Sequence, residues 1–221
     1  MSPRRYRLGR RKSAAESTRS RILEAARSLI AGKGDLAGFS MEAVAVQAGV
    51  SRMTVYNQFE SQPHLLEAVA DALAERGGMH RLAGAFLAPR LEDAVGVFVS
   101  TFVGFWASDR VLLRRLRAMG VLVPSVYRKV RERDAWRREA ARNLLARFGD
   151  RVSTRVARDP AWAADLLATL TSFEVFDMLC DETHPPDELA RSIAETVLAA
   201  WGATGPSRPS TRARGRRSAT T

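Results

Sequence analysis

One face of the stretch Ser51–Gln58 gathers side chains that form hydrogen bonds with nucleic acids. A helix repeats every 3.6 residues, so the positions opposite the apolar Val55 and Phe59 share an exposed face. That face carries Arg52, Met53, Thr54, Tyr56 and Asn57. A guanidinium, a hydroxyl, a phenol and an amide are groups that contact base edges or phosphates in a major groove. The stretch therefore favours recognition of nucleic acid.

Other kinds of chemistry find little support in the sequence. The single cysteine, Cys180, excludes a disulfide framework and a cysteine-based zinc site, and it is typical of a reducing cytoplasm. The three histidines, His64, His80 and His184, lack the spacing of metal ligands. A phosphate-binding loop and a recognisable pair of nucleophile and base are also missing from the sequence. We therefore expect a protein that is not an enzyme and that holds no cofactor and no metal.

The positive charge of the chain lies at its two ends. The formal net charge is +11, but residues 1–21 hold eight basic residues and one acid, and residues 203–221 hold five arginines and no acid. Both ends are rich in Ser, Thr, Pro and Gly, which predicts a basic disordered arm over 1–16 and a basic disordered tail over 203–221. Such charge indicates a polyanionic partner. For the tail, improved solubility is an alternative explanation.

The rest of the chain has the periodicity of helices and no convincing strand. Helices are predicted over 18–31, 40–48, 51–59, 63–76, 91–108, 109–119, 124–148, 160–182 and 187–201. We therefore expect an all-α protein with about nine helices. The longest uncharged apolar run, Ala94–Ala107, has 14 residues, whereas a membrane-spanning helix needs about 20. A soluble protein of the cytoplasm, without membrane contact, is expected.

Two of the predicted helices form a pair joined by a tight turn. Ser40 and Ser51 are typical N-cap residues, and Ala48-Gly49-Val50 between the helices provides a turn in which glycine adopts a positive φ angle. This arrangement is typical of a helix-turn-helix, whose second helix here presents the exposed polar face.

Residues 18–66 resemble the N-terminal DNA-binding domain of the TetR (tetracycline-repressor-like) transcriptional regulators. The resemblance is carried by Arg21–Ala26, Ser40, Val44-Ala45, Ala48–Ser51, Thr54–Phe59 and Leu65-Leu66. It implies a dimeric repressor in which residues 51–58 form the recognition helix and Thr54 and Tyr56 contact phosphates. The chain departs from the family pattern at Gln62, where a lysine is usual, and at the apolar Met53.

The resemblance divides the chain into a helix-turn-helix DNA-binding domain over 17–62 and a helical effector-binding and dimerisation domain over 63–202. The residues predicted to contact DNA are Arg19, Ser40, Ser51, Arg52, Met53, Thr54, Tyr56, Asn57 and Gln58. Because a two-fold dimer reads paired half-sites, the partner is expected to be a double-stranded DNA operator with an inverted repeat.

Aromatic and apolar residues of the larger domain have two interpretations, an effector pocket or simply the core. The pocket candidates are Phe98, Phe102, Phe105, Trp106, Leu116, Met119, Tyr127, Trp136, Phe173 and Phe176. Phe173 and Phe176 could instead lie at a subunit interface. An anionic effector attracted by Arg114, Arg115 or Arg117 is a weaker alternative. The chemistry of the effector is otherwise not indicated.

The last two predicted helices also carry small and apolar positions that suit a homodimer interface. The candidates are Leu167, Thr171, Val175, Met178, Leu189, Ile193, Val197 and Trp201. Two such helices from each protomer would form a four-helix contact.

The favoured function is a sequence-specific DNA-binding transcriptional regulator, a repressor that a small-molecule effector releases from its operator. Two alternatives stay open. One is a nonspecific or nucleoid-type DNA-binding protein without an effector, which the basic ends would suit. The other is a regulator that activates transcription.

Overall fold

The structure is a computed structural model that describes residues 3–32, 34, 36–149 and 152–202, and this part of the chain contains helices and no strand. The α-helices are α1 (Pro3–Ala31), α2 (Met41–Ala48), α3 (Arg52–Phe59), α4 (Gln62–Arg76), α5 (Leu82–Leu87), α6 (Leu91–Ser108), α7 (Arg110–Leu122), α8 (Pro124–Ala146), α9 (Thr154–Arg158), α10 (Pro160–Leu170), α11 (Phe173–Leu179) and α12 (Pro186–Trp201). Short 3-10 turns lie at Leu36–Gly38 and Met79–Arg81. The predicted all-α class is confirmed, but the described residues form twelve α-helices rather than about nine.

The additional helices arise from breaks that apolar periodicity does not reveal. The predicted helix over 160–182 is divided into α10 and α11, because Ser172 accepts a hydrogen bond from the backbone N–H of Val175 at 3.3 Å and starts a new helix. Both α5 and α9 are new and are six and five residues long. Helices this short complete fewer than two turns and show little periodic signal.

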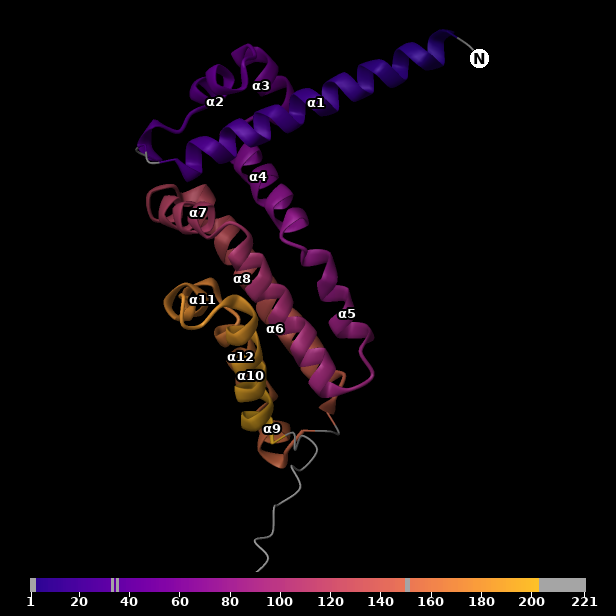
Figure 1. The fold of residues 1–221 in the computed structure, drawn as a ribbon, viewed down its shortest axis with the longest axis vertical. Coiled ribbons are helices and arrows are strands. Elements are labelled where there is room, and N and C mark those ends of the chain that lie inside the picture. Colours follow the sequence, from indigo (N-terminus) through magenta and orange to yellow (C-terminus); the bar gives the residue numbers. More distant parts are fainter. Residues whose placement is uncertain (1–2, 33, 35, 150–151, 203–221) are drawn as a thin grey trace, which may run out of the picture.

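The basic N-terminal stretch is helical where disorder was predicted. The first helix, α1, begins at Pro3 and is 29 residues long, so the part of the arm from Pro3 to Glu16 continues it. Arginine, lysine, leucine and alanine all have high helix propensity, and extending an existing helix requires no new nucleation. Figure 1 shows α1 projecting past α2 and α3. Residues 1–2 and the predicted disordered tail over 203–221 lie outside the described residues.

The first three helices form a compact unit at one end of the molecule, which we call the DNA-binding unit (Figure 1). Both α2 and α4 pack against α1, and α3 packs against α2. The core of this unit consists of apolar side chains that are 0–2% exposed, namely Ile22, Ala26, Ile30, Val44, Ala45 and Val55. The apolar residues Ile22, Ala26 and Ile30 therefore form the inner face of α1.

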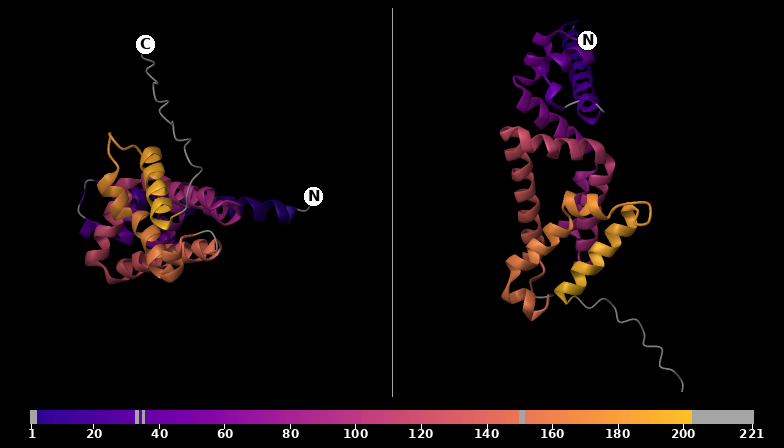
Figure 2. Two further views of the ribbon diagram at one scale, coloured as in Figure 1. Left: turned by 90° about the horizontal axis from the view of Figure 1, so that it is seen from below. Right: turned by 90° about the vertical axis from the view of Figure 1, so that its left-hand side faces the viewer.

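The remaining helices form an elongated body (Figure 2). The central helix, α6, packs against α5 and α12, and α8 packs against α10. The right-hand view of Figure 2 shows α7 crossing beneath the DNA-binding unit from the end of α6 to the start of α8. Both α4 and α7 contact α1. These two helices therefore connect the unit with the body.

Gly77 and Gly78 follow the end of α4. Gly78 has a φ of 77°, a left-handed conformation that glycine adopts without steric cost. A Cβ atom on Gly77 would lie 2.6 Å from the ring of Phe105 on α6, so this position also requires a residue without a side chain. The predicted end of the helix over 63–76 is confirmed.

The helix α6 is long and apolar enough to cross a membrane by length and composition alone. Half of its residues are buried inside the protein, where it packs against α5 and α12. A central helix of a helical body is apolar for the same reason, because it has neighbours on most of its circumference.

Candidate functional site

Local hydrogen bonds fix the geometry of the helix-turn-helix. Ser40 accepts a hydrogen bond from the backbone N–H of Ala43 at 3.1 Å, and Ser51 accepts one from the backbone N–H of Thr54 at the same distance. The two serines therefore cap α2 and α3, as their position in the sequence predicted. Gly49, with a φ of 63°, ends α2 and turns the chain toward α3.

The helix α3 exposes the side chains that the sequence placed on its outer face. Met53 is 68% exposed, and Arg52 and Asn57 are also exposed, while Val55 and Phe59 are buried. The Arg52 guanidinium lies 3.4 Å from the Tyr56 hydroxyl, and this hydrogen bond holds the pKa of Arg52 above its ordinary value. The face therefore combines a permanent cation with polar and apolar groups that can reach a major groove.

Arg19 of α1 and Gln62 of α4 stabilise the packing around α3 from outside this helix. The Arg19 guanidinium donates a hydrogen bond to the carbonyl of Gln58 at 3.1 Å and lies 4.4 Å from the centre of the Phe59 ring. Gln62, which stands where the family usually has lysine, donates a hydrogen bond to the carbonyl of Phe39 at 3.1 Å. Both contacts fix the C-terminal end of α3 and the start of α4.

The body contains a cavity of about 320 Å³ between α4, α6, α7 and α8. Five of the ten predicted pocket residues line it, namely Phe102, Phe105, Trp106, Leu116 and Trp136. The other five are placed elsewhere: Phe98, Met119, Phe173 and Phe176 are buried in the core, and Tyr127 is 54% exposed. Residues of α4 that the sequence did not indicate complete the wall, among them Pro63, Leu66, Ala70 and Leu73.

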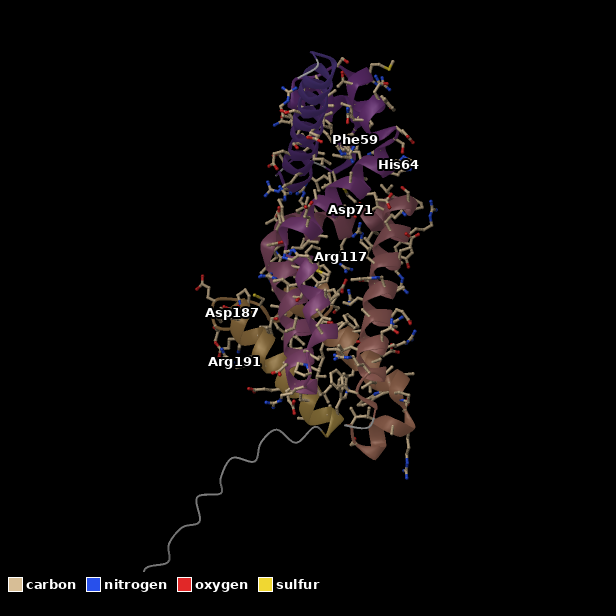
Figure 3. All side chains as sticks on the ribbon, turned by 90° about the vertical axis from the view of Figure 1, so that its right-hand side faces the viewer. Phe59, His64, Asp71, Arg117, Asp187 and Arg191 are labelled. Atoms are coloured by element: carbon tan, nitrogen blue, oxygen red, sulfur yellow. The ribbon has the colours of Figure 1, made fainter. Side chains whose placement is uncertain are left out.

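A charged cluster at the cavity wall was missed from the sequence. Asp134 accepts hydrogen bonds from Arg117 at 3.0 Å and from Arg137 at 2.8 Å, and Arg137 also donates to the carbonyl of Ala168 at 3.2 Å. Figure 3 shows Arg117 between the ribbon of α8 and those of α4 and α6. Although burial alone would raise it, the hydrogen bonds and charges of the two arginines lower the pKa of Asp134; burial lowers the pKa of Arg137.

The sequence did contain a signal for this cluster. Val126, Val130, Asp134, Arg137 and Ala141 recur at intervals of three or four residues, so the two charged residues occupy the inward stripe of α8. Charged side chains at such positions are buried only when they are paired, which makes them candidates for a site.

Two of the three arginines weighed as anion contacts are engaged outside the cavity. Arg114 forms an ion pair with Asp177 at 2.7 Å, and Arg115 donates a hydrogen bond to the carbonyl of Gly34. Of the three, only Arg117 lines the cavity.

Most residues predicted at a dimer interface are covered within the chain itself. Leu167, Thr171, Leu189, Ile193, Val197 and Trp201 are at most 5% exposed. The reason is that α10 and α12 use these apolar faces to pack against α8 and α6. Met178 is 75% exposed and Val175 is partly buried, so the outer surface of α11 is the part of the predicted set that faces outward.

Comparison with known proteins gives a family match for the helix-turn-helix region. Residues 22–69 match the sequence model of the bacterial regulatory proteins of the tetR family. This range contains the last third of α1, all of α2 and α3 with their caps, and the first half of α4. No curated protein matches the chain.

Solved structures share the fold over most of the chain. SmeT in complex with triclosan has a TM-score of 0.67 at 19% identity, covering 91% of this chain and 100% of that one. NalD of Pseudomonas aeruginosa, the secondary repressor of the MexAB-OprM multidrug efflux pump, has a TM-score of 0.65 at 24% identity, covering 84% and 96%. A transcriptional regulator of Rhodococcus sp. Rha1 has a TM-score of 0.62 at 18% sequence identity, and the match covers 82% of this chain and 96% of that one. Residues 22–69 therefore match the tetR family of bacterial regulatory proteins, and the chain shares its fold with these solved structures.

Proposed function

We propose that the protein is a cytoplasmic, homodimeric repressor that binds an inverted-repeat DNA operator and leaves it when a small molecule occupies the cavity between α4, α6, α7 and α8. The observation that carries the proposal is that two of the four cavity helices, α4 and α7, are also the helices that contact α1 of the DNA-binding unit. A ligand in the cavity therefore touches both connections between the two parts.

The connection through α7 consists of polar contacts. Arg27 on α1 forms an ion pair with Asp109, the N-cap residue of α7, at 2.8 Å. Arg115, in the middle of α7, holds the carbonyl of Gly34 in the segment after α1. A displacement of α7 by a ligand would therefore move α1 and the helices packed on it.

The connection through α4 is covalent as well as packed. Ser61 caps α4 directly after α3, with its hydroxyl 3.4 Å from the backbone nitrogen of His64. Leu66 and Leu73 of the same helix line the cavity. A rotation of α4 about its contacts with the ligand therefore changes the direction of α3.

Such a mechanism requires a ligand that binds two conformations with different affinity. In a dimer, the two recognition helices fit paired half-sites about 34–36 Å apart. In a conformation with a different distance between the two recognition helices, only one half-site is contacted. Each 1.4 kcal/mol of binding free energy lost in this way weakens DNA binding about tenfold. The relatives support this interpretation, since NalD is a repressor and SmeT was solved with triclosan.

On α3 we assign the base contacts to Arg52, Met53 and Asn57 and the phosphate contacts to Thr54 and Tyr56. The remaining candidates, Arg19, Ser40, Ser51 and Gln58, lie on or beside the same helix-turn-helix and adjoin the backbone of a bound duplex. For the dimer, the exposed apolar side chains of α11, Met178 and Leu179, favour a partner on that side of the body.

The test is footprinting on the DNA upstream of the protein's own gene, followed by affinity measurement on the protected sequence and on a random duplex of equal length. The proposal expects a protected inverted repeat and an affinity ratio of at least about 10³. A ratio near one would instead identify a nonspecific DNA-binding protein. Light scattering of the free protein gives the oligomeric state in the same preparation.

A further inference from the structure

We propose that the effector is a small organic acid with an apolar, ring-containing body, and that its acid group binds the guanidinium groups of Arg137 and Arg117 in the cavity. This inference rests on the proposed function only in taking the cavity as the effector site. It adds the chemical class of the effector and the residues that select it.

The first observation is a hydrogen-bond donor of Arg137 that the protein leaves free. Arg137 is 7% exposed and lines the cavity. Its Nε donates to the carbonyl of Ala168 and its Nη1 to Asp134, whereas its Nη2 has no hydrogen-bond partner among the residues that the structure describes. This Nη2 is not one of the fully buried unpaired polar atoms of these residues, so it remains accessible. A guanidinium is a planar fork that matches a carboxylate, and a bound acid would accept a hydrogen bond from this free donor.

The second observation is the charge of the wall. Of the four basic side chains lining the cavity, Lys129 pairs with Glu67 at 3.1 Å and Arg133 pairs with the exposed Asp71 at 2.6 Å. The other two, Arg117 and Arg137, share the single carboxylate of Asp134. The second acidic partner of Arg117 is Glu174, which is 61% exposed to solvent and does not line the cavity. Inside the cavity this pair of arginines therefore faces one carboxylate, which favours an anion there over a cation.

The third observation concerns the aromatic rings. The Arg137 guanidinium lies 5.9 Å from the centre of the Trp106 ring, and that of Arg117 lies 5.7 Å from the same ring. Arg137 also lies 6.0 Å from the centre of Phe102. Protein cations therefore already occupy ring faces that could otherwise hold a cationic ligand.

The apolar, ring-containing part of the ligand is inferred from the other residues that line the cavity. Trp136, which is 54% exposed, lines the cavity with its ring centre 6.5 Å from that of Phe102. Phe105, Leu66 and Leu113 provide further apolar surface. Aromatic rings favour offset or edge contacts with other rings. The volume of about 320 Å³ is at the lower end of the usual range for ligand pockets, so the occupant is small.

The test uses ligands of one shape and different charge, measured by calorimetry on the full chain without DNA. The set consists of naphthoate, naphthamide and naphthylmethylamine, with benzoate and anthracene carboxylate as smaller and larger acids. We expect naphthoate to bind the wild type roughly tenfold to a hundredfold more tightly than the amide, because a hydrogen bond to a charged group contributes that much. The amine should bind more weakly still.

Arg137→Gln should remove this preference, lowering the affinity for the acid and leaving that for the amide unchanged. The matched control is Arg138→Gln on the same helix, whose guanidinium is half-exposed and pairs with Asp165 at 3.1 Å. That variant should behave as the wild type does. If Arg137→Gln does not fold, as a thermal melt by circular dichroism would show, Arg137→Lys and Arg117→Gln provide the same comparison.

Three results would overturn the inference: equal or tighter binding of the amide or the amine, no binding of any acid in the series, or a loss in Arg137→Gln that affects acid and amide alike. Release of operator DNA is measured separately. Release by neutral compounds alone contradicts the acid class and leaves the proposed function standing. Acids that bind through Arg137 without releasing DNA support the acid site and contradict the effector role.

Discussion

In the DNA-binding unit the polar side chains of α3 point into solvent, and hydrogen bonds between residues three apart position them. In the cavity, Arg117, Asp134 and Arg137 are largely covered and come from α7 and α8, and α4 and α6 complete the wall. The DNA-binding unit is therefore organised by contacts between residues close in the sequence. The cavity forms only when α4, α6, α7 and α8 have packed together.

This difference separates two kinds of mutational effect. A change on the outer face of α3 should alter DNA affinity and leave stability unchanged, since the altered group contacts solvent in the free protein. A change in the charged cluster should alter stability as well as ligand binding, because it leaves a covered charge without its partner. The following predictions test this separation in order of decreasing effect.

Asp134→Ala should lower the free energy of unfolding by roughly 3 kcal/mol, because Arg117 and Arg137 lose their shared carboxylate in a covered site. Asp71→Ala is the control, since Asp71 is 66% exposed and pairs with Arg133 at 2.6 Å; its effect should be at most about 1 kcal/mol. Urea denaturation at neutral pH measures both. Equal effects would show that the cluster behaves as a surface ion pair.

The same cluster predicts a pH dependence of stability. The pKa of Asp134 is lowered below its ordinary value of 3.8 in the folded protein, so its ionised form stabilises the fold above that value. This contribution is lost as the pH falls through the lowered pKa. In Asp134→Ala the corresponding part of the acid-induced loss should be absent.

Asn57→Ala should weaken operator binding by about 1–3 kcal/mol and leave binding to random duplex unchanged, because an amide reads a base edge. Asn143→Ala is the matched control, on the exposed side of α8 in the body. Fluorescence anisotropy with labelled duplexes measures both affinities. A loss of equal size on operator and random DNA would assign Asn57 to the backbone contacts instead.

Ser51→Ala should lower the free energy of unfolding by about 1 kcal/mol, since the backbone N–H of Thr54 loses its acceptor. Ser20→Ala, on the exposed surface in the interior of α1, should leave stability unchanged or raise it slightly. Thermal melts of the two variants give the comparison. Identical melting temperatures would mean that packing alone positions α3.

Glu60→Gly should raise the free energy of unfolding by roughly 0.5–1 kcal/mol, because Glu60 has a φ of 59°, which is unfavourable for a residue with a side chain. Glu75→Gly in the last turn of α4 should change stability in the opposite direction. Denaturation experiments should therefore give changes in the free energy of unfolding of opposite sign for the same Glu→Gly substitution at the two positions. A destabilised Glu60→Gly would place the strain elsewhere.

The features that could be predicted from the sequence differ between these two regions. Ser40, Gly49 and Ser51 have residue types whose backbone roles are local, and the structure places them where the sequence did. Val55 and Phe59 are buried for the same local reason, because they share one face of a short helix. The helical extension of α1 back to Pro3 was missed because composition suggested disorder while propensity favoured helix.

The cavity could be predicted only in part. Phe102, Trp106 and Trp136 stood out as large aromatic residues, but Phe173 and Phe176 stood out equally and lie in the core. Which aromatic residue borders a void depends on how four helices pack, and a periodic pattern does not contain that information. Six residues predicted at the dimer interface are instead buried within the chain. An apolar stripe on a helix indicates that another element covers it, but it does not indicate whether that element belongs to the same chain or to a partner.

The central claim is that ligand binding in the cavity controls the affinity of α3 for DNA. It is tested most directly by measuring operator affinity with and without an acid that calorimetry has shown to bind the cavity, at a concentration that saturates the wild type and leaves Arg137→Gln unoccupied. The account predicts a loss of roughly fivefold to 150-fold in the wild type, as is typical of coupled sites, and none in the variant that no longer binds the compound. Unchanged operator affinity in the saturated wild type would contradict it.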